Sequence, residues 1–238
     1  MKIIVSDFDG TLFGKDFDEN RKAINDFVHR GNLFIIATGR AMNYLAEDLS
    51  MVDIDCEYYI CNDGGVIFDK YFNVVYRKDI KQELVRPIYH ILADDDNMLE
   101  TFIDTSHGYV SDTSKCANGI IARPYDRDKA MITLENILRK FPDINGYMST
   151  HWINLIDKDV SKKAAIDYLV ETYRYSDTDI YTVGDGMNDY DMIEHYKGYT
   201  FESSPEDLKR VAVGTVNNIK ELIELIDKKE EVVDDRGW

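Results

Sequence analysis

The sequence predicts an α/β fold, and two patterns support this. At both ends of the chain, short β-rich runs alternate with single helical patterns, as in βαβ units around a parallel sheet. Between them, at residues 81–157, the order changes to helix, strands, helix and strand. We therefore expect a Rossmann-like parallel-sheet core domain formed by residues 1–80 and 158–238, interrupted by an inserted α+β domain at residues 81–157.

The elements of the first part follow in a regular order. Ile3–Ser6 predicts a strand, and Glu19–Arg30 carries apolar residues at helical spacing before Gly31 ends the helix. The apolar run Leu33–Ala37 predicts a strand buried on both faces. The elements expected next are a helix at Met42–Leu49, a strand at Tyr58–Cys61 and a hairpin of Val66–Phe68 with Val74–Tyr76.

In the inserted part, Lys129–Lys140 is the clearest amphipathic helix, and Asp143–Gly146 predicts a turn. After Ser161 the first pattern resumes. The elements expected there are a helix at Lys163–Tyr173, a strand at Ile180–Val183, a helix from Asp189, strands at Tyr199–Glu202 and near Val211–Val213, and a helix at Ile219–Asp227. The charged tail Lys228–Trp238 is expected to be peripheral.

The charge of the chain restricts its partners. Among 238 residues, 28 Lys and Arg face 45 Asp and Glu, which gives a net charge of −17. This excess of acid repels polyanions, so we expect neither nucleic acid nor a membrane surface as the partner. The longest apolar run, Leu33–Ala37, is far shorter than the roughly 20 residues of a membrane span. The sequence leaves the oligomeric state open.

Three cysteines, Cys56, Cys61 and Cys116, form neither a disulfide framework nor a C-x-x-C pair. Such sparse cysteines fit a reducing compartment, and we expect a cytoplasmic protein. Each cysteine is interpreted as a small buried hydrophobic residue.

The first motif, Asp7-Phe8-Asp9-Gly10-Thr11, stands at the end of the first predicted strand. Two carboxylates two residues apart can face one space, and a glycine beside them lets the backbone approach a ligand. Such a pair can divide its work between a nucleophile and a proton donor. A solvated Asp-Gly turn is the alternative. A calcium loop of the EF-hand type is excluded, because Leu12 and Asp18 occupy the positions that require Gly and Glu.

Two further segments could hold a phosphate. The hydroxyl of Thr38, with the backbone N–H groups of Gly39 and Arg40, follows a buried strand. Lys162 stands at the start of a predicted helix and could serve as a point charge on a phosphate. Taken alone, each segment also fits an ordinary capped turn or a surface lysine.

The last motif is Gly184-Asp185-Gly186-Met187-Asn188-Asp189, after another apolar strand. Carboxylates gathered at the end of a buried strand are unfavourable unless a cation lies among them. Hard oxygen ligands favour Mg²⁺ over zinc. A polar glycine-rich loop is the alternative.

Together, the four motifs occur in the order of the haloacid dehalogenase (HAD) superfamily, which the chain resembles over Met1–Arg77 and Asp157–Asp227. The insert resembles the large type-2 cap of its sugar-phosphatase-like, Cof-type branch. Asp63-Gly64-Gly65 departs from the Asn-Gly-Ala more usual there. This departure leaves a substrate role of Asp63 open.

The resemblance implies a role for each site residue. Asp7 would be the nucleophile and Asp9 the general acid and base, with Thr38 and Lys162 completing the catalytic set. Mg²⁺ would bind Asp7, the backbone carbonyl of Asp9, and Asp185, while Asn188 and Asp189 would orient Lys162, the phosphate or metal-bound water. The residues expected to contact the substrate are Gly10, Thr38, Gly39, Arg40, Lys162 and Asn188.

The expected function is a Mg²⁺-dependent phosphatase of small phosphorylated metabolites, with sugar phosphates as the first candidates. A phosphomutase or phosphotransferase could use the same aspartyl-phosphate, and a noncatalytic phosphate- or Mg²⁺-binding module is a third possibility. In the insert, Lys115, Arg123 and His151 could reach a polar substrate, although a solvated surface position is the simpler interpretation of each.

Overall fold

The computed structural model describes residues 1–149 and 151–234 of the chain. It confirms the predicted α/β class, with a parallel sheet and helices at its centre. The chain forms two compact units. The first contains residues 1–38, 49–59 and those from 166 onward, and the second contains residues 39–48 and 60–165. The predicted domain boundaries at 80/81 and 157/158 stay a prediction.

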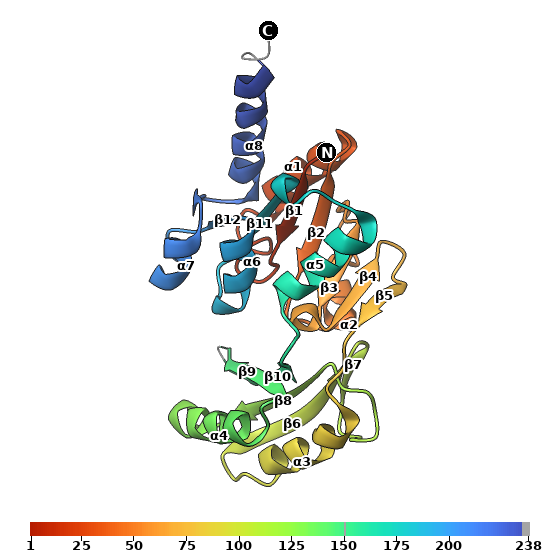
Figure 1. The fold of residues 1–238 in the computed structure, drawn as a ribbon, viewed down its shortest axis with the longest axis vertical. Helices are drawn as coiled ribbons and strands as arrows, with labels where there is room; N and C mark the ends of the chain where they lie inside the picture. The colour runs from red at the N-terminus through yellow and green to blue at the C-terminus, as the bar shows by residue number, and fades with distance from the viewer. Residues whose placement is uncertain (150, 235–238) are drawn as a thin grey trace. The chain divides into compact units, whose positions relative to one another are not determined.

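A parallel sheet forms the centre of the first unit (Figure 1). Strand β1 (Ile3–Ser6) lies between β2 (Leu33–Ala37) and β11 (Ile180–Val183), and β12 (Lys197–Thr200) and β13 (Gly214–Thr215) continue beyond β11. Every residue of β1 and β11 is buried, as in sheets covered on both faces. Since these strands run parallel, their carboxyl ends share one edge, where ligands bind in such sheets.

Helices cover this sheet. In α1 (Phe17–His29), Ile24 and Phe27 are buried, and the helix packs against α8. The remaining helices of this unit are α6 (Tyr190–His195), α7 (Glu206–Val211) and α8 (Ile219–Asp234), with one-turn helices at Asp177–Asp179 and Met187–Asp189. No helix within residues 1–149 and 151–234 is long and apolar enough to cross a bilayer.

The C-terminal prediction needs two corrections and one addition. The strand expected at Tyr199–Glu202 lies at Lys197–Thr200. The strand expected near Val211–Val213 lies directly after these residues, at Gly214–Thr215, because acidic residues after Pro205 begin helix α7, which continues to Val211. The expected peripheral tail is helical as far as Asp234, as part of α8, and its last four residues lie outside the described chain.

The second unit contains an antiparallel sheet of five strands in the order β7-β6-β8-β10-β9 (Figure 1). The strands are β6 (Met98–Thr105), β7 (Gly108–Val110), β8 (Gly119–Pro124), β9 (Ile144–Met148) and β10 (Ile153–Asp157). Helices α3 (Gln82–Ala93) and α4 (Arg127–Lys140) pack on one face, against Ile103, Ile120, Leu155 and their neighbours. Because side chains alternate along a strand, Asp104, Ile121 and Asn154 point to the opposite face.

The other elements of this unit match their predictions closely. Strands β4 (Val66–Asp69) and β5 (Val74–Arg77) pair as an antiparallel hairpin. Helix α2 (Met42–Leu49) lies almost wholly in this unit. Strand β3 (Tyr58–Cys61) and helix α5 (Lys162–Tyr173) contain the points at which the chain passes between the units.

The turn predicted at Asp143–Gly146 is wrong beyond its first residue. Strand β9 begins at Ile144, and Gly146 lies opposite Leu155 in the ladder with β10. A Cβ atom at Gly146 would lie 2.6 Å from the Leu155 side chain and 2.9 Å from the Asn154 carbonyl. The glycine therefore permits close packing inside a strand, which the Asn-Gly pair in the sequence could not reveal.

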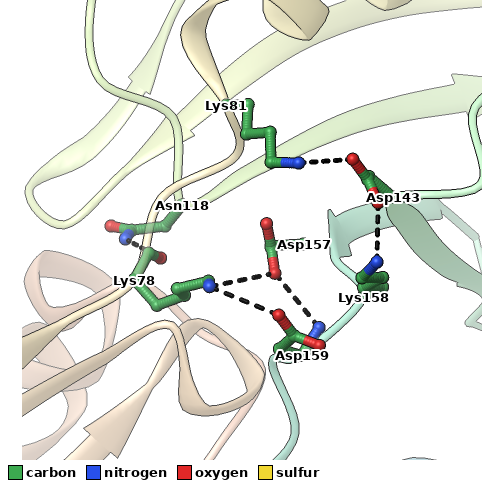
Figure 2. A network of polar contacts seen from close by, with 7 residues as sticks. All are labelled: Lys78, Lys81, Asn118, Asp143, Asp157, Lys158 and Asp159. Carbon is green, nitrogen blue, oxygen red and sulfur yellow. Dashed lines mark hydrogen bonds and ion pairs between the residues drawn. The ribbon is translucent and has the colours of Figure 1, made fainter.

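An ionic network joins the two chain segments that flank the five-stranded sheet (Figure 2). Lys78 lies 3.6 Å from buried Asp157 and 3.4 Å from Asp159. Asp143 accepts hydrogen bonds from Lys158, at 2.7 Å, and from Lys81. These two lysines lower the pKa of Asp143 to about 2. The network thus connects residues 78–81 with residues 157–159 through charge pairs that are mostly exposed.

Candidate active site

Three carboxylates meet beside the carboxyl ends of β1 and β11. Asp7 follows β1 directly, and Asp185 and Asp189 belong to the loop and one-turn helix after β11. One ligand atom from each lies within 4.8 Å of the others. Asp7 is only 6% exposed and Asp189 is fully buried. The first and fourth motifs of the sequence therefore come together, as their positions at strand ends predict.

Hydrogen bonds fix this group in place. The Thr11 hydroxyl donates to Oδ1 of Asp185 at 2.8 Å. Oδ2 of Asp189 accepts from the backbone N–H groups of Asp185, at 3.1 Å, and Gly186, at 3.0 Å. The Asp189 carboxylate thus holds the Asp185 loop. Its expected role in orienting Lys162, the phosphate or metal-bound water stays a prediction. Thr11 thus also holds Asp185 in place, although the sequence indicated Thr11 only as a member of the first motif.

Two glycines allow the carboxylates to approach the backbone. Gly10 has a φ of +79°, and a Cβ atom there would lie 2.6 Å from Oδ2 of Asp185. A Cβ atom at Gly184 would overlap the Asp189 carboxylate. A side chain at either position would displace an acid of the cluster.

The cluster fits a magnesium ion. Its donors are carboxylate oxygens, the ligands that Mg²⁺ prefers, and a cation among them would offset the repulsion between three neighbouring carboxylates, two of them buried. Asp7 and Asp185 are the expected side-chain ligands. Asp9 is exposed, and its predicted backbone contact to the metal stays a prediction.

Two other predicted site residues, Thr38 and Asn188, belong to the first unit. Thr38 follows β2 directly and is buried. Asn188 is half-buried in the one-turn helix, and a Cβ atom at Gly186 would lie 2.6 Å from its Oδ1. Substrate contacts of Thr38 and Asn188 stay predictions.

Gly39, Arg40 and Lys162 belong to the second unit. Arg40 forms an ion pair with Asp48, and its carbonyl accepts the Asn62 N–H at 3.0 Å. Lys162, the first residue of α5, is 1% exposed. The interpretation of Lys162 as a surface lysine is therefore wrong, and its burial fits a charge held for a specific partner.

Two of the three candidate residues of the insert share a hollow. Arg123 and His151, with Tyr125 and Arg127, line a cavity of about 320 Å³. Lys115 is exposed and does not line it. Cys116 is exposed too, which corrects its interpretation as buried, whereas Cys56 and Cys61 are buried and all three thiols are free.

Comparisons with known proteins agree with this geometry. The profile of the haloacid dehalogenase-like hydrolase family matches residues 4–129 and 111–221. The 5-amino-6-(5-phospho-D-ribitylamino)uracil phosphatase YwtE of Bacillus subtilis is 27% identical over 245 residues, which cover 82% of this chain and 85% of that protein. A second phosphatase of that name from Bacillus subtilis, YcsE, is 33% identical over 97 residues, covering 38% of this chain and 37% of YcsE.

Solved structures show the same fold. A haloacid dehalogenase-like hydrolase from B. subtilis has a TM-score of 0.80 at 18% identity, over 94% of this chain and 99% of that one. The HAD subclass IIB sugar phosphatase BT4131 has a TM-score of 0.77 at 18% identity, over 95% and 99%. The family match over most of the sequence confirms the resemblance and the predicted enzyme class: the chain belongs to the haloacid dehalogenase-like hydrolases and is a phosphatase of that family.

Proposed function

We propose that the chain is a Mg²⁺-dependent phosphatase that hydrolyses small phosphorylated metabolites through an aspartyl-phosphate, with sugar phosphates as the first class to test. The observation that carries the proposal is the group formed by Asp7, Asp185 and Asp189 at the strand ends. The names of YwtE, which acts on a phosphorylated ribityl compound, and of the sugar phosphatase with the same fold support a small phosphorylated substrate.

The two acids of the first motif would share the reaction. A carboxylate oxygen of Asp7 attacks phosphorus in line with the leaving oxygen, so a P–O bond to Asp7 forms as the ester P–O bond breaks. Asp9 gives its proton to the leaving alkoxide. Water then attacks the phosphorus of the aspartyl-phosphate and gives a proton to Asp9, while the P–O bond to Asp7 breaks. This step releases phosphate and restores both carboxyl groups. The exposure of Asp9 suits a group that exchanges protons with substrate and water.

Asp7, the backbone carbonyl of Asp9, and Asp185 would hold the metal. When bound, Mg²⁺ supplies the positive charge that lets a carboxylate approach a phosphate dianion. The Asp189 carboxylate keeps the Asp185 loop in position through its two backbone hydrogen bonds.

The phosphate itself would be held by the second and third motifs. The Thr38 hydroxyl and the N–H groups of Gly39 and Arg40 suit phosphoryl oxygens. The Lys162 ammonium would offset the remaining charge, and Asn188 would orient it or the phosphate. Lys162 is 1% exposed, so water screens its charge poorly and the ammonium would act strongly on a phosphate beside it, which supports this role.

Under this function the partner is a small phosphorylated molecule, and we expect neither nucleic acid nor a membrane surface as a partner. The three free cysteines support the cytoplasm as the location. Transfer to a second alcohol instead of water, as in a phosphomutase, would use the same residues, so the assay must also look for transferred phosphate.

The test is a panel of phosphorylated metabolites incubated with the purified chain, with Mg²⁺ or with a chelator, and read as inorganic phosphate. We expect release that requires Mg²⁺ and is lost in Asp7→Asn. The matched control is Asp18→Asn, which removes an exposed acid of α1. Phosphate release by Asp7→Asn at the wild-type rate would refute the nucleophile, and no release or transfer with any substrate would favour a binding module.

A further inference from the structure

A small polar cavity lies within the second unit, and none of the roles assigned so far uses it. Its polar lining comes from Asn62, Asp63, Asp104, Asn118 and Asn154, and Gly39 completes one side. The space measures about 10 Å³, enough for one water molecule or one non-hydrogen atom of a ligand. Asp104 and Asn154 reach it from β6 and β10, on the sheet face opposite α3 and α4.

Several buried polar atoms around the cavity have no hydrogen-bond partner. They are Oδ1 and Nδ2 of Asn62, Oδ1 of Asp104 and Oδ1 of Asn118. The three side chains are at most 5% exposed. Buried polar groups in native proteins are almost always satisfied, so these atoms indicate that a polar group from outside the chain occupies the space.

The charges of the lining residues indicate which kind of polar group fits the cavity. Asp63 and Asp104 are both buried, and no lining residue, all of them in the described part of the chain, is a Lys, Arg or His. The Tyr147 hydroxyl donates to Oδ2 of Asp63 at 2.6 Å. Burial, together with the charge of Asp63, raises the pKa of the Asp104 carboxyl well above its usual range. The side chains that line the cavity therefore supply no positive charge themselves.

The unpartnered atoms are three oxygen acceptors and one nitrogen donor. A hydroxyl group offers one hydrogen-bond donor, and a water molecule offers two. A primary ammonium offers three donors and a positive charge. The ammonium matches both the number of acceptors and the buried acids.

The cavity also adjoins the segments to which the proposed function assigns the phosphate. A Cβ atom at Gly39 would lie 3.1 Å from Oδ1 of Asp63. The Asn62 N–H donates to the Arg40 carbonyl, and Gly64 packs against the backbone of Ser161 and Lys162. The turn that carries Asn62 and Asp63 is thus held between both phosphate-binding segments of this unit.

The backbone conformation of this turn also supports a functional role. Asn62 and Asp63 have φ values of 52° and 54°, in the left-handed region that residues other than glycine rarely adopt. Such conformations persist where the surrounding structure holds a functional group in place.

We propose that this cavity, the Asn62–Asp104 pocket, binds a primary ammonium group on the alcohol part of the substrate, and that the enzyme prefers amino-bearing phosphate monoesters. The inference rests on the proposed function, because it takes the phosphate to lie at Gly39, Arg40 and Lys162. Asp63 gains the substrate role that the sequence left open.

The first measurement compares ω-aminoalkyl phosphates of increasing length with the ω-hydroxyalkyl phosphates that differ from them only in the terminal group. At the length that reaches the pocket, we expect kcat/KM to be about tenfold higher for the amine, the effect of one charge-assisted interaction. Asp104→Asn, which keeps the size of the side chain, should reduce this ratio to about one. Asp96→Asn, at an exposed acid of the same unit, should leave the ratio unchanged.

The second measurement is binding of the same pairs to Asp7→Asn, followed as the rise in Tm with ligand concentration, which needs neither turnover nor a folded Asp104 variant. Tighter binding of the amine at one length supports the pocket. Equal binding and equal kcat/KM at every length overturn it, as does an amine preference that survives Asp104→Asn. If p-nitrophenyl phosphate is not hydrolysed either, the proposed function fails, and the binding comparison still decides on the pocket.

Discussion

The glycine beside the Asp185 carboxylate offers the sharpest test of the site geometry. Gly10→Ala would place a Cβ atom 2.6 Å from Oδ2 of Asp185, whereas ordinary van der Waals contact begins near 3.4 Å. The carboxylate would therefore have to move by about 0.8 Å, the difference between 3.4 and 2.6 Å. Because Asp185 is an expected metal ligand, this shift changes the cluster itself.

The size of the effect follows from two terms. A misplacement of about 1 Å in a catalytic arrangement can lower kcat by about 100-fold. Separately, alanine at a φ of +79° costs about 1 kcal/mol of folding free energy, and the smaller entropy of the unfolded variant offsets part of that. We thus expect Gly10→Ala to fold with a Tm a few degrees lower, to lose most of its activity and to bind Mg²⁺ more weakly.

Gly14→Ala is the matched control. It introduces the same methyl group four residues away, where a Cβ atom would meet nothing within 4 Å. The assay combines Mg²⁺ titration by calorimetry with p-nitrophenyl phosphate hydrolysis for both variants. If Gly10→Ala kept Mg²⁺ affinity and kcat within twofold of Gly14→Ala, the contact between this glycine and Asp185 would have no role in the site.

Three other predictions address separate features. Asp9→Ala should slow the hydrolysis of alkyl phosphates far more than that of p-nitrophenyl phosphate, whose leaving group needs little protonation; equal losses in kcat would refute the general acid. In the native protein a thiol reagent should modify exposed Cys116 rapidly and the two buried thiols only after unfolding, because burial raises the pKa of Cys56 to about 12; rapid modification of more than one thiol would contradict this. The pKa of Asp143 is lowered from 3.8 to about 2, so its contribution to stability is present above pH 4 and lost as the pH falls through 2. The Tm difference between wild type and Asp143→Asn should therefore shrink between pH 5 and pH 2, and a constant difference would show that its ion pairs do not stabilise the fold.

Three strands of the large sheet could be predicted closely from the sequence because they are buried along almost their whole length. Leu33–Ala37, Tyr58–Cys61 and Ile180–Val183 are short apolar-rich runs, and their bounds in the structure are those expected. The motifs that follow these strands could be found for the same reason, since a parallel sheet brings its carboxyl ends to one edge. The meeting of Asp7 with Asp185, 178 residues later (185 − 7), needed only that rule.

One error arose where contacts distant in sequence decide the structure, and another where a nearby helix start outweighed strand propensity. Asn145-Gly146 has the composition of a turn, but its glycine lies in a strand because Leu155 and Asn154 leave no room for a side chain. Val211 has strand propensity, yet it ends a helix that the residues after Pro205 begin. Propensity and turn signals describe the neighbours in sequence, and tertiary contacts override them at such positions.

The Asn62–Asp104 pocket could not be predicted from the sequence for the same reason. Asp104 is one polar residue in an alternating strand, and nothing near it in sequence indicates that it faces Asn62 and Asp63.

The structure buries acids in two places that differ in what can neutralise them. At the strand ends, three carboxylates converge within reach of one ion, and a divalent cation would satisfy them. In the pocket, two carboxyl groups stand beside three amide atoms without a hydrogen-bond partner, around a space for a single atom, too small for a hydrated metal ion. Burial raises the pKa of Asp104, and a charged ammonium beside this carboxyl would oppose that rise. A substrate carrying both phosphate and ammonium would then suit this protein for one physical reason: its positive end reduces the repulsion that a net charge of −17 exerts on its negative end.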